Sequence, residues 1–225
     1  MPNDLKRADR GYRVGVLFFL VLPILFVLHT GCQSLNPLPG LGVGDATPEE
    51  VRIRKLMKWH SARVAVYRDF RTVFTARAVY LSDEIQRLAA DWEIKSTLMN
   101  PEERNAFEER FFKEDSQFIK ILVGFYTPEE ELNDLNEDNS TWIPYLKNSD
   151  GTVRRASCLS VSEENARIYM RFLKWDLSWS KLYLLCFPSS PELSTDEEGR
   201  ISVVISGPEG SGEIRLQVTP PDDQT

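Results

Sequence analysis

The residues best suited to chemistry in this chain of 225 residues are three cysteines and two histidines. Imidazole and thiolate are the groups most often used for acid–base and nucleophilic steps near neutral pH. His29 follows an apolar N-terminal run, so His60 is the one histidine in the body of the chain. His60 stands at the expected end of a helix, where histidine commonly binds the last carbonyl groups. We therefore expect it to cap that helix or to face solvent.

Motifs for nucleophilic, zinc or phosphate chemistry are missing. The sequence holds no G-x-S-x-G, H-E-x-x-H or G-x-x-x-x-G-K-[ST] pattern. Cys158 has no histidine nearby in the sequence. Two carboxylates alone can support glycoside hydrolysis, but nothing in the sequence distinguishes such a pair among the 34 acidic residues. We therefore predict a non-catalytic protein without a cofactor or a metal.

Cys32 lies at the end of a three-part N-terminal segment. A basic start is followed by an uninterrupted apolar run over residues 14–28, and then by HTGC at positions 29–32. This run is short for a membrane span and is typical of a secretory signal. The small residues Thr30 and Gly31 directly before Cys32 resemble the lipobox of bacterial lipoproteins, although His29 stands where that family usually has Leu.

The resemblance implies that residues 1–31 are a signal peptide and that the Cys32 thiol carries a diacylglyceryl group. Two or more acyl chains hold a protein stably at a bilayer. The resemblance therefore implies that the protein is attached to the membrane through the lipid on Cys32. Residues 32–46 would then form the tether. Gln33 in place of Asp points to the outer membrane, facing the periplasm. An inner-membrane anchor stays open, as does an uncleaved anchor with a buried Cys32.

The charge of the chain limits its other partners. Residues 1–31 hold four of the 27 basic and two of the 34 acidic residues, so the remainder has a net charge of −9. Nucleic-acid binding requires basic patches, and we expect none. An aromatic content of 11% is too high for a disordered chain.

Cys158 and Cys186 both lie in apolar runs typical of strands. An oxidising compartment would permit a disulfide between them. The alternative is two separate buried thiols, because a free cysteine packs as a small hydrophobic residue.

The pattern of residues predicts an α+β fold, with N-terminal helices packed on an antiparallel, immunoglobulin-like β-sandwich. A mainly helical segment is expected over 47–116, with helices that start at Thr47, Ser82 and Asn100. Residues 62–81 fit either a helix or a strand, and β-branched and aromatic content favours a strand over 71–81. A β-sandwich domain is expected over 117–225. Its seven strands are predicted at 118–126, 141–148, 153–162, 166–173, 181–187, 200–206 and 213–219.

Two further stretches stand out. Asp134, Asn136 and Asp138 have the spacing of a calcium loop, but the Gly and Glu that an EF-hand requires later in the loop are absent. A solvated loop is the better interpretation. Trp175 and Trp179 are expected to pack in or against the core.

These observations favour a lipid-anchored envelope protein that binds a protein partner through its β-sandwich or supports envelope assembly. The alternative is a carboxylate-based hydrolase acting on peptidoglycan or another glycan. A small-ligand carrier would need a large apolar cavity, which sandwiches seldom enclose.

Overall fold

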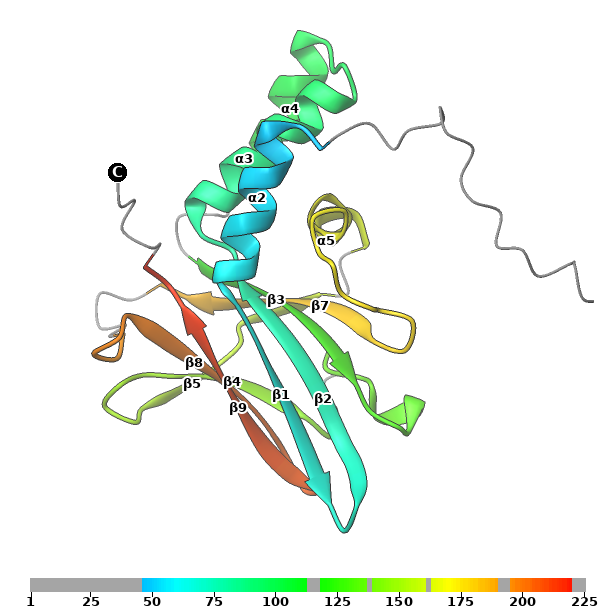
Figure 1. The fold of residues 1–225 in the computed structure, drawn as a ribbon, viewed down its shortest axis with the longest axis vertical. Coiled ribbons are helices and arrows are strands. Elements are labelled where there is room, and N and C mark those ends of the chain that lie inside the picture. Colours follow the sequence, from blue (N-terminus) through cyan, green and yellow to red (C-terminus); the bar gives the residue numbers. More distant parts are fainter. Residues whose placement is uncertain (1–45, 113–117, 137–138, 161–162, 190–194, 220–225) are drawn as a thin grey trace, which may run out of the picture. The chain divides into compact units, whose positions relative to one another are not determined.

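The computed structural model describes residues 46–112, 118–136, 139–160, 163–189 and 195–219, which belong to one compact unit that begins at Ala46 (Figure 1). The fold is α+β, as predicted. Its helices are α2 (Pro48–Trp59), α3 (Asp83–Ser96), α4 (Pro101–Phe112) and α5 (Glu163–Met170). Its strands are β1 (Ser61–Arg68), β2 (Arg71–Tyr80), β3 (Phe118–Tyr126), β4 (Ile143–Lys147), β5 (Val153–Arg155), β6 (Cys158–Ser160), β7 (Lys181–Pro188), β8 (Arg200–Gly207) and β9 (Gly210–Gln217).

The strands form two antiparallel sheets. The first has the order β1-β2-β3-β7-β6 and the second has the order β5-β4-β8-β9. Strand β1, at the edge of the first sheet, contacts β9, at the edge of the second. Gly212 permits this contact, because a Cβ there would lie 2.9 Å from the side chains of both Val66 and Phe74.

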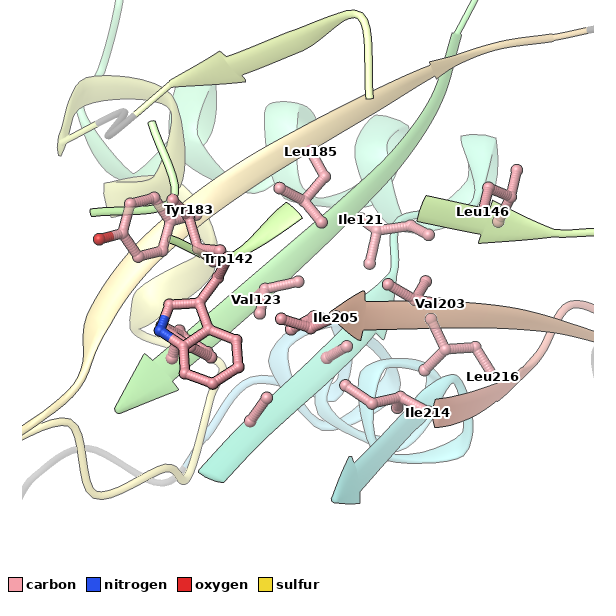
Figure 2. Close-up of a cluster of buried hydrophobic side chains, with 14 of the residues drawn as sticks. Ile121, Val123, Trp142, Leu146, Tyr183, Leu185, Val203, Ile205, Ile214 and Leu216 are labelled. Atoms are coloured by element: carbon pink, nitrogen blue, oxygen red, sulfur yellow. The ribbon is translucent and has the colours of Figure 1, made fainter. Parts of the chain in front are cut away.

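One hydrophobic core draws on both sheets. Strand β8 alternates as a half-buried strand should, with Ile201, Val203 and Ile205 buried and the residues between them partly exposed. Figure 2 shows Val203 and Ile205 facing side chains of the first sheet, with Trp142 at one side of the cluster.

A second core lies between the first sheet and the helices. Strands β3 and β7 contribute side chains to both cores, which explains why they read as nearly continuous apolar runs. The helical contributions are Ile53 and Met57 from α2, Ile85 and Ala89 from α3, Phe107 and Phe111 from α4, and Ala166 and Tyr169 from α5.

The predicted helix starts are confirmed. The Thr47 hydroxyl accepts from the Glu50 amide at 3.2 Å, and the Glu50 carboxylate accepts from the Thr47 amide at 3.0 Å. The Ser82 hydroxyl caps α3 by accepting from the Ile85 amide at 3.3 Å. The Asn100 side chain accepts from the amides of Glu102 and Glu103. These bonds satisfy amides that have no partner inside the helix.

The strand preferred over 71–81 is confirmed as β2, and residues 61–68 form a further strand. Both belong to the segment expected to be mainly helical. Because β2 pairs with β3 over Thr75–Tyr80, the expected boundary at residue 117 falls inside one sheet.

The predicted strand over 166–173 is wrong, because most of it lies in α5. Ala166, Tyr169 and Phe172 are spaced three apart and are buried against the other helices and the sheet. The strand predicted over 153–162 divides at Ala156 and Ser157 into β5 and β6, which belong to different sheets. The last hairpin loop is shorter than expected, since Gly207 already pairs with Gly210.

Candidate functional site

The turn between β1 and β2 has an unusual backbone conformation. Arg68 pairs with Arg71, so Asp69 and Phe70 alone make the turn. Both have positive φ, 50° and 65°. Two-residue hairpins need this backbone, but Asn and Gly normally supply it. A bulky residue such as Phe at positive φ is an outlier that costs about 1 to 2 kcal/mol.

The strained turn places aromatic side chains in solvent. Phe70 is fully exposed and Tyr67 is 67% exposed. Neither side chain is buried at its position, so burial within the fold does not compensate for the backbone strain. Strain of this kind tends to persist at functional sites.

A hollow of about 310 Å³, which we call the hairpin hollow, lies beside this turn. Its residues come from β1, β2, the end of β3 and the two loops that follow β3 and β8. Two arginines and two glutamates line it, together with an apolar and hydroxylic wall. They are Arg68, Arg71, Thr72, Val73, Tyr126, Thr127, Pro128, Glu129, Leu132, Trp142 and Glu209. Within the part of the chain that the structure describes, neither Arg68 nor Arg71 forms an ion pair.

The segment after β3 is held firmly against the first sheet. The Asn133 side chain donates to the carbonyl of Phe125 at 2.9 Å and accepts from the Tyr183 hydroxyl at 2.9 Å. Lys181 donates to the carbonyl of Asn133 at 2.8 Å. This part of the acidic stretch is therefore anchored by a buried amide, which the expectation of a solvated loop did not include.

Trp142 closes the inner end of the hairpin hollow. Its ring lies 5.0 Å from that of Phe74 in an edge-on arrangement, and 6.1 Å from that of Phe125. Gly207 packs against it, since a Cβ there would lie 2.5 Å from Cε3 of Trp142. The hollow thus has a rigid floor below a turn that projects into solvent.

This combination suits contact with another protein. Residues that dominate binding at interfaces are enriched in aromatic side chains and arginine. The hairpin presents Tyr67, Arg68, Phe70 and Arg71 within five consecutive positions.

Two of the three cysteines can be located. Cys186, in β7, is disulfide-bonded and belongs to the core below the helices. Cys158, in β6, is its register partner across the strand pair. Cys32 lies outside the described residues.

The candidate calcium residues are only partly described. Asp134 accepts a hydrogen bond from the Ser140 hydroxyl at 2.8 Å, and Asp138 lies outside the described residues. Among the residues that are described, no cluster of three His, Cys, Asp or Glu side chains could hold a metal.

His60 stands at the end of α2, as expected, but its side chain neither binds the last carbonyls of that helix nor faces solvent, because it is buried. Its amide donates to the carbonyl of Leu56, and its Nδ1 donates to the carbonyl of Gln217. Burial lowers the pKa of this imidazole below its usual value of 6.5, and the bond to Gln217 and the charge of Glu84 oppose that effect.

Trp175 and Trp179 differ in burial. Trp175 is half-buried over Gly124, as expected, whereas Trp179 is 81% exposed, so the expectation of core packing is wrong for Trp179.

Comparison with protein-family models, curated proteins and solved structures finds no match to this chain. In the described ranges, no helix has the length and apolar character needed to cross a membrane.

Proposed function

We propose that this protein is a non-catalytic, lipid-anchored lipoprotein of the cell envelope. Cys32 carries the lipid at the periplasmic face of the outer membrane, and residues 32–46 tether the folded unit. That unit is an immunoglobulin-like β-sandwich covered by helices. Its β1–β2 hairpin binds a protein partner of the envelope.

The hairpin turn carries this proposal. A sequence selected for stability alone would place Asn-Gly at positions 69 and 70. Instead, a strained backbone displays Phe70 beside two arginines that make no ion pair among the described residues. The hairpin hollow next to it offers a place for a partner side chain.

Site-specific crosslinking tests the partner interface. A photoreactive phenylalanine analogue at position 70 is expected to give a discrete crosslinked species in cells that carry the protein. The same analogue at Val153, which is exposed on β5, serves as the control. The crosslink at position 70 should disappear when Arg68 and Arg71 are both changed to Gln. Equal crosslinking at both positions would argue against the hairpin.

The anchor requires a separate test. The change Cys32→Ser is expected to abolish incorporation of labelled fatty acid and to leave the precursor unprocessed, because this thiol is the proposed acceptor. Continued labelling of Cys32→Ser would reject the lipidation site.

The alternative function, a carboxylate-based hydrolase, has one observation in its favour. Glu129 and Glu209 line the same hollow. Release of glycan fragments from peptidoglycan by the wild-type protein, and its loss in both Glu129→Gln and Glu209→Gln, would replace the binding function with this one.

A further inference from the structure

A second hollow lies on the helical side of the molecule, between α2 and the segment after α5. We call it the α2 groove. Its volume is about 590 Å³, within the range of small-molecule sites. It is lined by Val51, Arg54, Lys55, Met57, Lys58, Ser61, Phe172, Leu173, Lys174 and Trp175.

The helical period places the α2 residues of this groove on one stripe. Positions 54 and 55 lie three and four residues after 51, and 58 lies four and three residues after them, so the four positions share a face of α2. Ile53 and Met57 are the buried residues of α2, and Met57 also lines the groove. The sequence RKLMK therefore supplies basic residues to the groove and apolar ones to the interior.

The floor of the groove is apolar. Met57 and Phe172 are almost fully buried beneath it, and Leu173 and Trp175 are partly exposed. Val51 is 54% exposed at one edge. A ligand with an apolar body would remove this surface from water, which is favourable at roughly 25 cal/mol per Å².

The charged side chains that line the groove in the described part of the chain are all basic. They are Arg54, Lys55, Lys58 and Lys174. Within the described part of the chain, none of the four takes part in an ion pair. The Nε atom of Arg54 is buried without a hydrogen-bond partner. This concentration of positive charge occurs in a chain with a net charge of −7.

The other charged side chains of α2 form contacts away from the groove. Arg52 pairs with Glu84 at 2.5 Å and Glu49 pairs with Lys95 at 2.6 Å, both across to α3. Glu50 is held by the N-cap at Thr47. The acidic residues of α2 therefore lie toward α3 and at the N-terminus of the helix. They do not neutralise the basic side chains that face the groove.

We infer that the α2 groove binds a single-chain anionic amphiphile, with the acyl chain along the apolar floor and a carboxylate or phosphate head among Arg54, Lys55 and Lys58. The basic rim matches the head, and the floor matches the chain. This inference is independent of the proposed partner binding by the hairpin, which lies at the far end of β1 from α2 (Figure 1).

Calorimetric titration with dodecyl phosphate, kept below its micelle concentration, tests the inference. The protein used is the fragment 46–225, because the unit that begins at Ala46 contains both hydrophobic cores. We expect binding of one molecule per chain. Shortening the alkyl chain should weaken binding by up to about fourfold per methylene removed. Inorganic phosphate has the anionic head without the alkyl chain, and dodecyl maltoside has the alkyl chain without the anionic head. Each should bind at least tenfold more weakly than dodecyl phosphate.

Two variants assign the binding to the groove. Lys55→Gln with Lys58→Gln should weaken dodecyl phosphate binding about tenfold or more, because both lose a charge-assisted bond to the head. Lys147→Gln with Arg215→Gln removes the same charge from the outer face of the second sheet and should leave binding unchanged. Val51→Trp, at an exposed position, fills the groove and should block the amphiphile without unfolding the protein.

Several results would overturn the inference. Absent binding would do so, as would equal binding by the two double variants. If inorganic phosphate binds as well as dodecyl phosphate, the groove is a simple anion site. If phosphatidylglycerol vesicles sediment the fragment through Lys55 and Lys58 while monomeric dodecyl phosphate does not bind, the groove is a bilayer contact and not a site for a free amphiphile.

Discussion

The Nδ1 atom of His60 lies 2.5 Å from the carbonyl oxygen of Gln217 and joins the end of α2 to the last strand. The ring of His60 also meets that of Tyr80 edge-on, with centroids 5.6 Å apart. Since a carbonyl can only accept, the neutral imidazole carries its proton on Nδ1. One side chain thus joins α2, β2 and β9.

This contact predicts a pH dependence of stability. The folded state has the lower pKa for His60, because burial disfavours the imidazolium. As pH falls below the unfolded value of 6.5, the unfolded chain binds the proton first, so stability present above pH 6.5 is lost.

Urea unfolding at several values from about pH 7.5 to about pH 5.5 measures the effect. His60→Asn keeps a donor for Gln217 and removes the titration, so its unfolding free energy should vary less with pH than that of the wild type. Parallel curves for the two proteins would assign the pH dependence to other groups.

Local signals in the sequence predicted the helix starts well. Thr47 and Asn100 each precede Pro and a Glu at the third helical position, and the bonds involved span three residues or fewer. Strands β3 and β7 were also predictable, because burial of both faces produces long apolar runs.

Tertiary packing decided the elements that the sequence did not predict. Ile168, Tyr169 and Phe172 favour a strand by residue type, but α5 and the turn after it bury them, with Tyr169 against Phe111 and Phe172 against Trp92. The hairpin turn had no local signal, since Asp69 and Phe70 are poor turn residues for positive φ. The α2 groove requires α2 and the segment after α5 to meet, which no local pattern encodes.

The disulfide of Cys186 gives the second prediction. Cys158 is its register partner, and we expect Cys158–Cys186 to be the bonded pair. A peptide map without reduction should contain this linked pair. Closing a loop of roughly 30 residues is worth about 3 to 4 kcal/mol in the chain-entropy account. Reduction should lower the unfolding free energy by about that amount in the wild type and leave Cys158→Ser with Cys186→Ser unaffected. A map that links Cys186 to Cys32 would contradict the pairing.

Gly207 provides the third prediction. A methyl group there would lie 2.5 Å from Cε3 of Trp142 and 2.8 Å from the carbonyl oxygen of Thr141. Trp142 is enclosed by Phe74 and Phe125 and cannot move aside. Gly207→Ala should therefore cost about 3 kcal/mol of unfolding free energy, the upper end for overpacked cores.

Gly210→Ala is the matched control for Gly207→Ala. It lies across the same hairpin, where a methyl group would meet only Cγ1 of Val66 at 3.2 Å. A small shift of that side chain relieves the contact, so the cost should be less than about 1 kcal/mol. Chemical denaturation measures the unfolding free energy of both variants. Equal losses of unfolding free energy would show that the Trp142 side chain moves aside more easily than its packing indicates.

The last prediction separates stability from binding at the β1–β2 turn. Asp69→Asn with Phe70→Gly gives the turn residues that positive φ prefers, and Phe70 loses no burial because it is already exposed. The unfolding free energy should rise by about 1 kcal/mol, equivalent to a melting temperature higher by roughly 2 to 4 °C. When the anchored protein is purified, the same double variant should no longer co-purify with its envelope partner. The single variant Phe70→Trp keeps an aromatic side chain in the strained turn, and it should retain the partner without the gain in stability. If the stabilised double variant still binds the partner fully, the strain at Asp69 and Phe70 does not serve binding, and the interface lies elsewhere on the molecule.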